Sequence, residues 1–137
     1  MKPDPVVHFE MPYENAKRVS DFYTKAFGWN MHTLGKEMGD YVLAGTAEMD
    51  ENMMIKTPGK INGGFFKNDG TVPPYPSVVV SVDNLESGME RVKKAGGKLI
   101  DKPQMIPGIG NFIAFTDSEG NRVGMLEPVK KDEQTRG

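Results

Sequence analysis

His8 and Glu10, near the start of the chain, are the residues whose types and spacing best suit chemistry. Apolar side chains at Val7, Phe9 and Met11 alternate with them, which is the period of a β-strand with one face on a core. His8 and Glu10 therefore share the opposite face. A carboxylate beside an imidazole can hold and pass a proton, and such a pair suits proton abstraction next to a carbonyl group. A hydrogen-bonded histidine in a polar pocket, with no catalytic role, is the alternative.

The strand that carries His8 opens a plan that occurs twice in the chain. Asn15 can cap a following amphipathic helix, and Gly28 can end it. A second copy begins at Ser77 and ends at Gly97. The spacing from His8 to Ser77 equals the spacing from Gly28 to Gly97. Six side chains form the apolar stripe of the first helix and are expected to pack on the strand: Ala16, Val19, Phe22, Tyr23, Ala26 and Phe27.

Each predicted helix is followed by three predicted strands, so each half has the order βαβββ. The fold class is predicted as α+β, with two paired βαβββ modules that form an open barrel-like cleft and carry their helices outside. The chain is expected to form one domain over residues 1–137. Its parts are module one at 4–66, a linker at 67–76, module two at 77–128 and a charged, frayed tail at 129–137.

Module two should contribute small side chains to the same cleft. The alternation of its first and last strands places four residues there: Ser77, Val79, Ser81 and Leu126. No base lies beside either serine in sequence, so we interpret these residues as inert lining that sets the volume of the cleft. The strand aromatics are interpreted as core residues, with stacking on an aromatic ligand as the alternative: Trp29, Phe65, Phe66, Phe112 and Phe115.

The segment 46–60 is acidic, then rich in methionine, and carries a proline and a glycine, so it is predicted to be a loop. Met53 and Met54 within it could line an adaptable lid over a ligand, or could be incidental residues of a plain loop. His32, on a short predicted strand, is interpreted as a surface histidine.

Composition excludes several classes of function. The chain has 137 residues and a formal net charge of -2, and its basic residues are scattered, so nucleic acid is not an expected partner. No apolar run approaches the roughly 18 residues that span a bilayer. With no cysteine, thiolate metal sites and cysteine nucleophiles are excluded. We expect a protein of the cytoplasm that has no membrane partner.

Several motifs in order resemble the vicinal-oxygen-chelate superfamily, the group of glyoxalases, bleomycin-resistance proteins and extradiol dioxygenases. They run from His8 and Phe27-Gly28-Trp29 through Asn62-Gly63-Gly64-Phe65-Phe66 to Phe115-Thr116-Asp117-Ser118-Glu119-Gly120-Asn121, so the resemblance covers nearly the whole chain. It implies paired βαβββ modules and a homodimer. It also implies a small organic molecule as the ligand.

Members that use a divalent metal typically draw four ligands, often two His and two Glu, from the first and last strands of each module. His8 falls on the first of these positions and would be a ligand if a metal bound. Ser77 and Gly124 stand where further ligands are expected, and the strand at 61–66 offers no carboxylate. Catalytic zinc needs about three protein ligands, so no metal cofactor is expected.

The function predicted from the sequence is therefore a glyoxalase-like protein that binds a small organic molecule in the cleft. A metal-independent lyase or proton-transfer step through His8 and Glu10 would make it an enzyme. Non-catalytic sequestration of a drug or metabolite, in the manner of bleomycin-resistance proteins, is the second hypothesis. A divalent-metal-dependent lyase or dioxygenase is the third.

Overall fold

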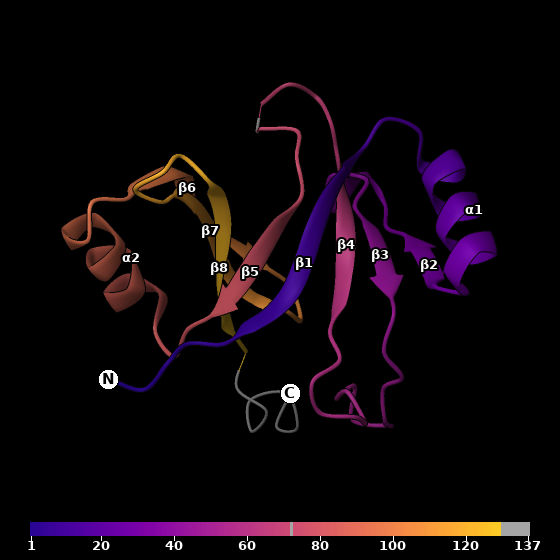
Figure 1. Cartoon of the computed structure of the whole chain (residues 1–137), viewed down its shortest axis with the longest axis horizontal. Coiled ribbons are helices and arrows are strands. Elements are labelled where there is room, and N and C mark those ends of the chain that lie inside the picture. The colour runs from indigo at the N-terminus through magenta and orange to yellow at the C-terminus, as the bar shows by residue number, and fades with distance from the viewer. Residues whose placement is uncertain (72, 130–137) are drawn as a thin grey trace. The chain divides into compact units, whose positions relative to one another are not determined.

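The computed structural model describes residues 1–71 and 73–129, and the chain divides into two compact units. One unit is His8–Pro76, and the other combines Met1–Val7 with the chain from Ser77 onward. Each unit contains an open sheet of four strands with one α-helix on a single face (Figure 1). The predicted α+β class, the two βαβββ modules and the external helices are confirmed.

The His8–Pro76 unit holds the first copy of the plan. Its sheet has the order β2-β3-β4-β1, in which β1 and β4 are parallel and the other pairs are antiparallel. The elements are β1 (Val6–Tyr13), α1 (Ala16–Phe27), β2 (Asn30–Thr33), a 3-10 turn at Lys36–Met38, β3 (Val42–Gly45) and β4 (Asn62–Lys67).

The two ends of α1 are fixed by the residues that the sequence indicates. The Asn15 side chain accepts a hydrogen bond from the Arg18 backbone nitrogen at 2.8 Å. Gly28 ends the helix with a left-handed backbone, φ +70°, a conformation that costs glycine little.

The core of this unit lies between α1 and the sheet. Phe65 lies in the centre of this core and is 1% exposed. Val19 and Tyr23 of α1 pack against the core. The Tyr23 ring stacks on Trp29 with centroids 4.5 Å apart, so Trp29 and Phe65 are core residues as predicted. Phe22 and Phe27 are 58% and 65% exposed, so their predicted packing on the strand is wrong.

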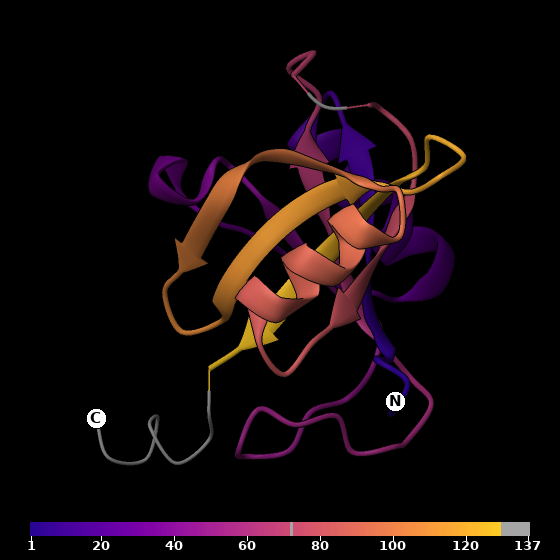
Figure 2. The same ribbon diagram turned by 90° about the vertical axis from the view of Figure 1, so that its left-hand side faces the viewer.

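The second copy forms the other unit, whose sheet has the order β5-β8-β7-β6. Figure 2 shows α2 lying across β7 and β8. Val82, Leu85, Ile113 and Met125 form the buried core beneath this helix. The elements are β5 (Ser77–Ser81), α2 (Leu85–Lys94), β6 (Lys98–Ile106), β7 (Gly110–Thr116) and β8 (Arg122–Pro128).

Strand β6 continues past Lys102 through Pro103. Its register with β7 shifts between Ile100 and Gln104, where Asp101 has φ 62°. An edge strand tolerates a proline because its outer N–H groups need no partner strand, and the irregularity absorbs the break in the ladder.

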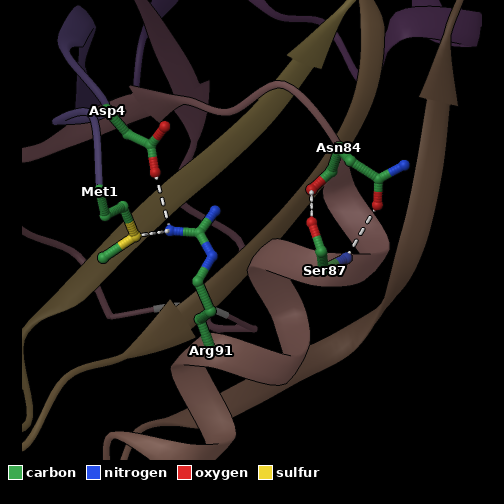
Figure 3. Close-up of polar contacts among 5 residues, drawn as sticks. All are labelled: Met1, Asp4, Asn84, Ser87 and Arg91. Atoms are coloured by element: carbon green, nitrogen blue, oxygen red, sulfur yellow. Dashed lines mark hydrogen bonds and ion pairs between the residues drawn. The ribbon is translucent and has the colours of Figure 1, made fainter.

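The N-terminal residues are fastened to this second unit. Arg91 of α2 forms an ion pair with Asp4 at 2.9 Å, and its guanidinium also lies 3.6 Å from the Met1 sulfur (Figure 3). The Pro5 carbonyl accepts a hydrogen bond from the Ser81 nitrogen at 2.9 Å. The segment that leads into β1 is thus anchored by α2 and β5.

Two polar contacts of α2 should differ in their contribution to stability. Asn84→Ala removes the acceptor that satisfies the Ser87 nitrogen at 2.8 Å and should lower the free energy of unfolding by about 1 kcal/mol. Arg91→Ala removes an ion pair that is partly exposed to water, and it should lower the free energy of unfolding by at most about 1 kcal/mol. Urea unfolding measures both values, with Asn84→Asp as the control that keeps the acceptor. A larger loss in Arg91→Ala than in Asn84→Ala would contradict this ranking.

The segment 46–60 forms no named helix or strand, as predicted, although an isolated antiparallel bridge joins Met49 to Ile55. Of the linker at 67–76, all but residue 72 is described, and of the tail at 129–137 only Val129 is, so the predicted fraying at 130–137 lies outside the described residues. Neither α-helix in the described part of the chain has the length and apolar character needed to cross a membrane.

Candidate functional site

Strand register places His8 and Glu10 on the face of their sheet that α1 does not cover. In β4, Asn62 lies opposite His8 and Gly64 lies opposite Glu10. Phe9 and Met11 point to the other face and pack in the core. The alternation predicted from the sequence therefore holds, and the two polar side chains of β1 are neighbours on one face.

A tyrosine hydroxyl joins the two polar side chains. The Tyr41 hydroxyl donates to Glu10 Oε2 at 2.8 Å and lies 3.1 Å from His8 Nε2. Because a hydroxyl has only one hydrogen, and Glu10 receives it, His8 Nε2 must carry a hydrogen and donate to the tyrosine oxygen. The three side chains form a directed chain from His8 through Tyr41 to Glu10, and we call it the His8–Tyr41–Glu10 relay.

Gly64 provides the space in which the Tyr41 ring lies. A Cβ atom built on Gly64 would overlap carbon atoms of that ring, so any larger residue would displace the tyrosine. Gly64 is buried inside β4, where the chain has no side chain to occupy this space. The sequence did contain a signal for Tyr41, because Tyr41 and Leu43 alternate with core residues, but nothing in it indicated which strand lies opposite.

In the other unit, the side chains predicted to line a cleft share one face of the sheet. Val79 pairs with Gly124, and Ser81 with Leu126, in the parallel register of β5 and β8. Ser77 is partly buried and Val79 is 3% exposed. A role in ligand binding for Ser77, Val79, Ser81 and Leu126 stays a prediction.

Arg122 is a residue of this face that sequence reasoning missed. It is 7% exposed, and its guanidinium donates to the Ser77 hydroxyl at 3.1 Å. Arg122 lies two residues before Gly124 in the same strand, so the alternation that identified Gly124 and Leu126 also pointed to it. The buried guanidinium on this face makes the surroundings of Ser77 polar.

Comparison with known proteins identifies the family. Residues 6–125 match the sequence profile of the Glyoxalase/Bleomycin resistance protein/Dioxygenase superfamily. The chain belongs to this superfamily. The match spans both βαβββ modules, and it agrees with the resemblance found in the sequence motifs.

Relatives and solved structures extend this result. The chain is 28% identical over 120 residues to a glyoxylase-like domain-containing protein of Didymella fabae, covering 82% of this chain and 84% of that protein. It is 29% identical over 86 residues to a putative glyoxylase, CFP32, of Mycobacterium bovis, covering 63% of this chain and 28% of that protein.

Among solved structures, a variant of Streptomyces coelicolor methylmalonyl-CoA epimerase has a TM-score of 0.69 at 10% identity. The match covers 94% of this chain and all of that one. A hypothetical protein of Bacillus halodurans has a TM-score of 0.66 at 12% identity, covering 94% of this chain and 97% of that one. At these identities the likeness concerns the fold.

Divalent metals are common in the superfamily. At three of the ligand positions that the resemblance implies, this chain has His8, Ser77 and Gly124. His8 Nε2 is hydrogen-bonded to the Tyr41 hydroxyl, and the Ser77 hydroxyl accepts a hydrogen bond from the Arg122 guanidinium. Gly124 has no side chain, and the Phe112 ring lies where its Cβ would be. Within residues 1–71 and 73–129, no group of three or more His, Asp or Glu side chains converges on a point that a metal could occupy.

Burial lowers the pKa of His8 below its ordinary value of 6.5, and the nearby Glu10 carboxylate offsets part of this effect. A half-buried imidazole is harder to protonate than one in water, because the charged form loses hydration. His8 is therefore uncharged at neutral pH, which leaves Nδ1 with a free lone pair when Nε2 carries the hydrogen.

The lowered pKa of His8 makes stability depend on pH. Below about pH 6.5 the unfolded chain binds a proton at His8 that the folded chain resists, so the free energy of unfolding should fall as the pH decreases through that value. Above pH 6.5 the contribution is fully present. Urea unfolding from about pH 5 to about pH 8 measures the slope, and His8→Asn should reduce it. A His8→Asn protein with an unchanged slope would show that other groups cause the loss.

Proposed function

We propose that this protein binds a small carbonyl compound and transfers a proton at the carbon next to the carbonyl, with its own side chains as acid and base. The observation that carries the proposal is the His8–Tyr41–Glu10 relay, which connects a half-buried imidazole to a carboxylate that is 7% exposed. The donor set around His8 does not suit a metal, so the proposed step uses none.

The relay allows a balanced proton transfer. His8 Nδ1 takes the substrate proton while the hydrogen on Nε2 passes to the Tyr41 oxygen, and the tyrosine hydrogen passes to Glu10. The imidazole stays neutral throughout, Glu10 gains the proton, and the electron pair of the broken C–H bond moves into the carbonyl group of the substrate. Reversal of the same movements returns a proton to the substrate, which produces isotope exchange or isomerisation.

The comparisons support this class of chemistry in general terms. The superfamily includes the glyoxalases, and several solved neighbours are named methylmalonyl-CoA epimerases. Epimerisation inverts a carbon centre, and the removal and return of a proton is a route to such inversion. The identity of the substrate does not follow from these matches.

Deuterium exchange tests the proposal directly. Acetone, dihydroxyacetone and pyruvate are incubated with the protein in D₂O, and proton NMR follows the loss of the signal next to each carbonyl. We expect exchange in the wild-type protein and a decrease of about 10²–10⁴-fold in His8→Ala. His32→Ala is the matched control, because His32 is an exposed histidine of β2. Equal rates in His8→Ala and the wild type would contradict the proposal.

Metal dependence is tested in the same assay. Dialysis against EDTA should leave the exchange rate unchanged, and titration with nickel, zinc or manganese should show no tight stoichiometric site. Loss of exchange after dialysis, with recovery on addition of one metal, would favour a metal-dependent lyase instead.

A binding protein without catalysis is the second candidate. The Ser77 hydroxyl is already engaged by Arg122, and Val79 and Gly124 on the same face are apolar, which suits retention of a molecule better than its conversion. Mass spectrometry of metabolite mixtures incubated with the protein separates the two candidates. A compound that is retained but never altered would favour binding.

A further inference from the structure

The loop at 46–60 leaves the sheet directly beside His8. Asn62 lies opposite His8 in the parallel register of β1 and β4, so both side chains point to the same face. Its Oδ1 accepts hydrogen bonds from the backbone nitrogens of Thr46 at 2.8 Å and Ala47 at 2.7 Å. The Thr46 hydroxyl in turn donates to the Ile61 carbonyl. These bonds draw the beginning of the loop onto the face that carries the His8–Tyr41–Glu10 relay.

The tip of the loop is a turn held together by its own hydrogen bonds. The Asp50 nitrogen donates to the Met54 carbonyl at 2.7 Å, and Asp50 Oδ1 accepts from the Met54 nitrogen at 3.0 Å. Met49 and Ile55 form an antiparallel bridge at its base. These bonds give the backbone of the turn a defined shape.

Three methionines of this turn are exposed. Met53 is 71% exposed, Met54 is 54% exposed and Met49 is 42% exposed. Apolar surface in water is unfavourable, and unbranched methionine side chains adapt to ligands of varied shape. The segment 48–54 also contains three acidic residues and no basic one, which disfavours an anionic ligand.

We infer that Met53 and Met54 contact the apolar part of a substrate whose carbonyl group lies at His8. The inference rests on the proposed function and narrows its substrate class to uncharged carbonyl compounds that carry an alkyl or aryl group. The carbonyl end meets the relay, and the apolar end meets the methionines of the loop. Met53 and Met54 are specificity-determining residues and take no part in proton transfer.

A homologous series of ketones tests the inference. Deuterium exchange is measured for acetone, 2-butanone, 2-hexanone and 2-octanone, and kcat/KM in the wild-type protein should rise by up to about fourfold per added methylene. In the double variant Met53→Gln/Met54→Gln this increase should disappear. Met53→Leu/Met54→Leu is the matched control and should retain the increase. An equal chain-length dependence in the Gln and Leu variants would overturn the inference.

A second measurement separates this inference from the proposed function. Protein labelled with ¹³C at the methionine methyl groups is titrated with 2-octanone in the Glu10→Gln background, where exchange is slow. Shifts of the Met53 and Met54 methyl signals support the contact between the methionines and the ketone. If these shifts occur but the wild-type protein catalyses no exchange, only the proposed function is overturned. Unshifted methyl signals, with exchange intact in the wild type, would overturn only the inference.

Discussion

Replacing Tyr41 with phenylalanine should slow deuterium exchange by about 10²–10³-fold. The change removes one oxygen atom, yet that oxygen joins His8 Nε2 to Glu10 Oε2. Without it, the imidazole must become a cation in a half-buried position when it takes the substrate proton, because its own hydrogen cannot pass to Glu10. The lowered pKa of His8 shows that this position already disfavours the charged form.

The control for this substitution is Tyr23→Phe, which removes the same atom from a tyrosine on the helix-covered face. Tyr23 stacks on Trp29 and packs in the core, so its substitution should leave the exchange rate unchanged. A Tyr41→Phe protein with wild-type exchange would show that Glu10 acts without the tyrosine, and the mechanism proposed above would be wrong.

Glu10→Gln should have an effect similar to that of Tyr41→Phe, and the two effects should not add. Residues that act as one unit lose their joint contribution when any member is removed. The double variant should therefore exchange at nearly the rate of the slower single variant. Independent contributions would instead multiply the two losses.

The sequence predicted two of the three residues of this relay, His8 and Glu10, and physical reasons explain why Tyr41 was not predicted. Alternation along one strand is a local property, so it correctly placed His8 and Glu10 on one face. The contact of Tyr41 with Glu10 depends on β3 lying beside β4 and on the register between them, and neither is set by residues near position 41. The contact between the Tyr41 ring and Gly64 can be predicted only when that register is known.

The helix stripe shows a similar limit. A period of 3.6 residues identified Val19 and Tyr23 correctly but also included Phe22 and Phe27, which are exposed. Both phenylalanines fit the period of the stripe, yet neither is among the residues packed in the core. Arg122 was missed for a different reason, since a charged residue in a strand is usually solvated, and only its contact with Ser77 reveals its burial.

Gly64→Ala should both lower the rate of deuterium exchange and decrease the free energy of unfolding. The added methyl group would overlap the Tyr41 ring, so the ring must leave its place, and overpacking of this kind costs about 1–3 kcal/mol. Exchange should fall at least as far as in Tyr41→Phe, on the order of 10²-fold or more. Gly45→Ala is the matched control in the neighbouring strand, because a methyl group there only approaches Asn30 closely, and it should affect both quantities little.

A double variant separates the two effects of Gly64→Ala. Tyr41→Leu removes the ring with which the new methyl group collides, so Gly64→Ala/Tyr41→Leu should regain most of the lost free energy of unfolding. Its exchange rate should remain low, because no hydroxyl then joins His8 to Glu10. Recovery of stability without recovery of exchange would show that Gly64 serves the site by holding the Tyr41 ring. If the double variant is as unstable as Gly64→Ala, the glycine is required by the strand itself.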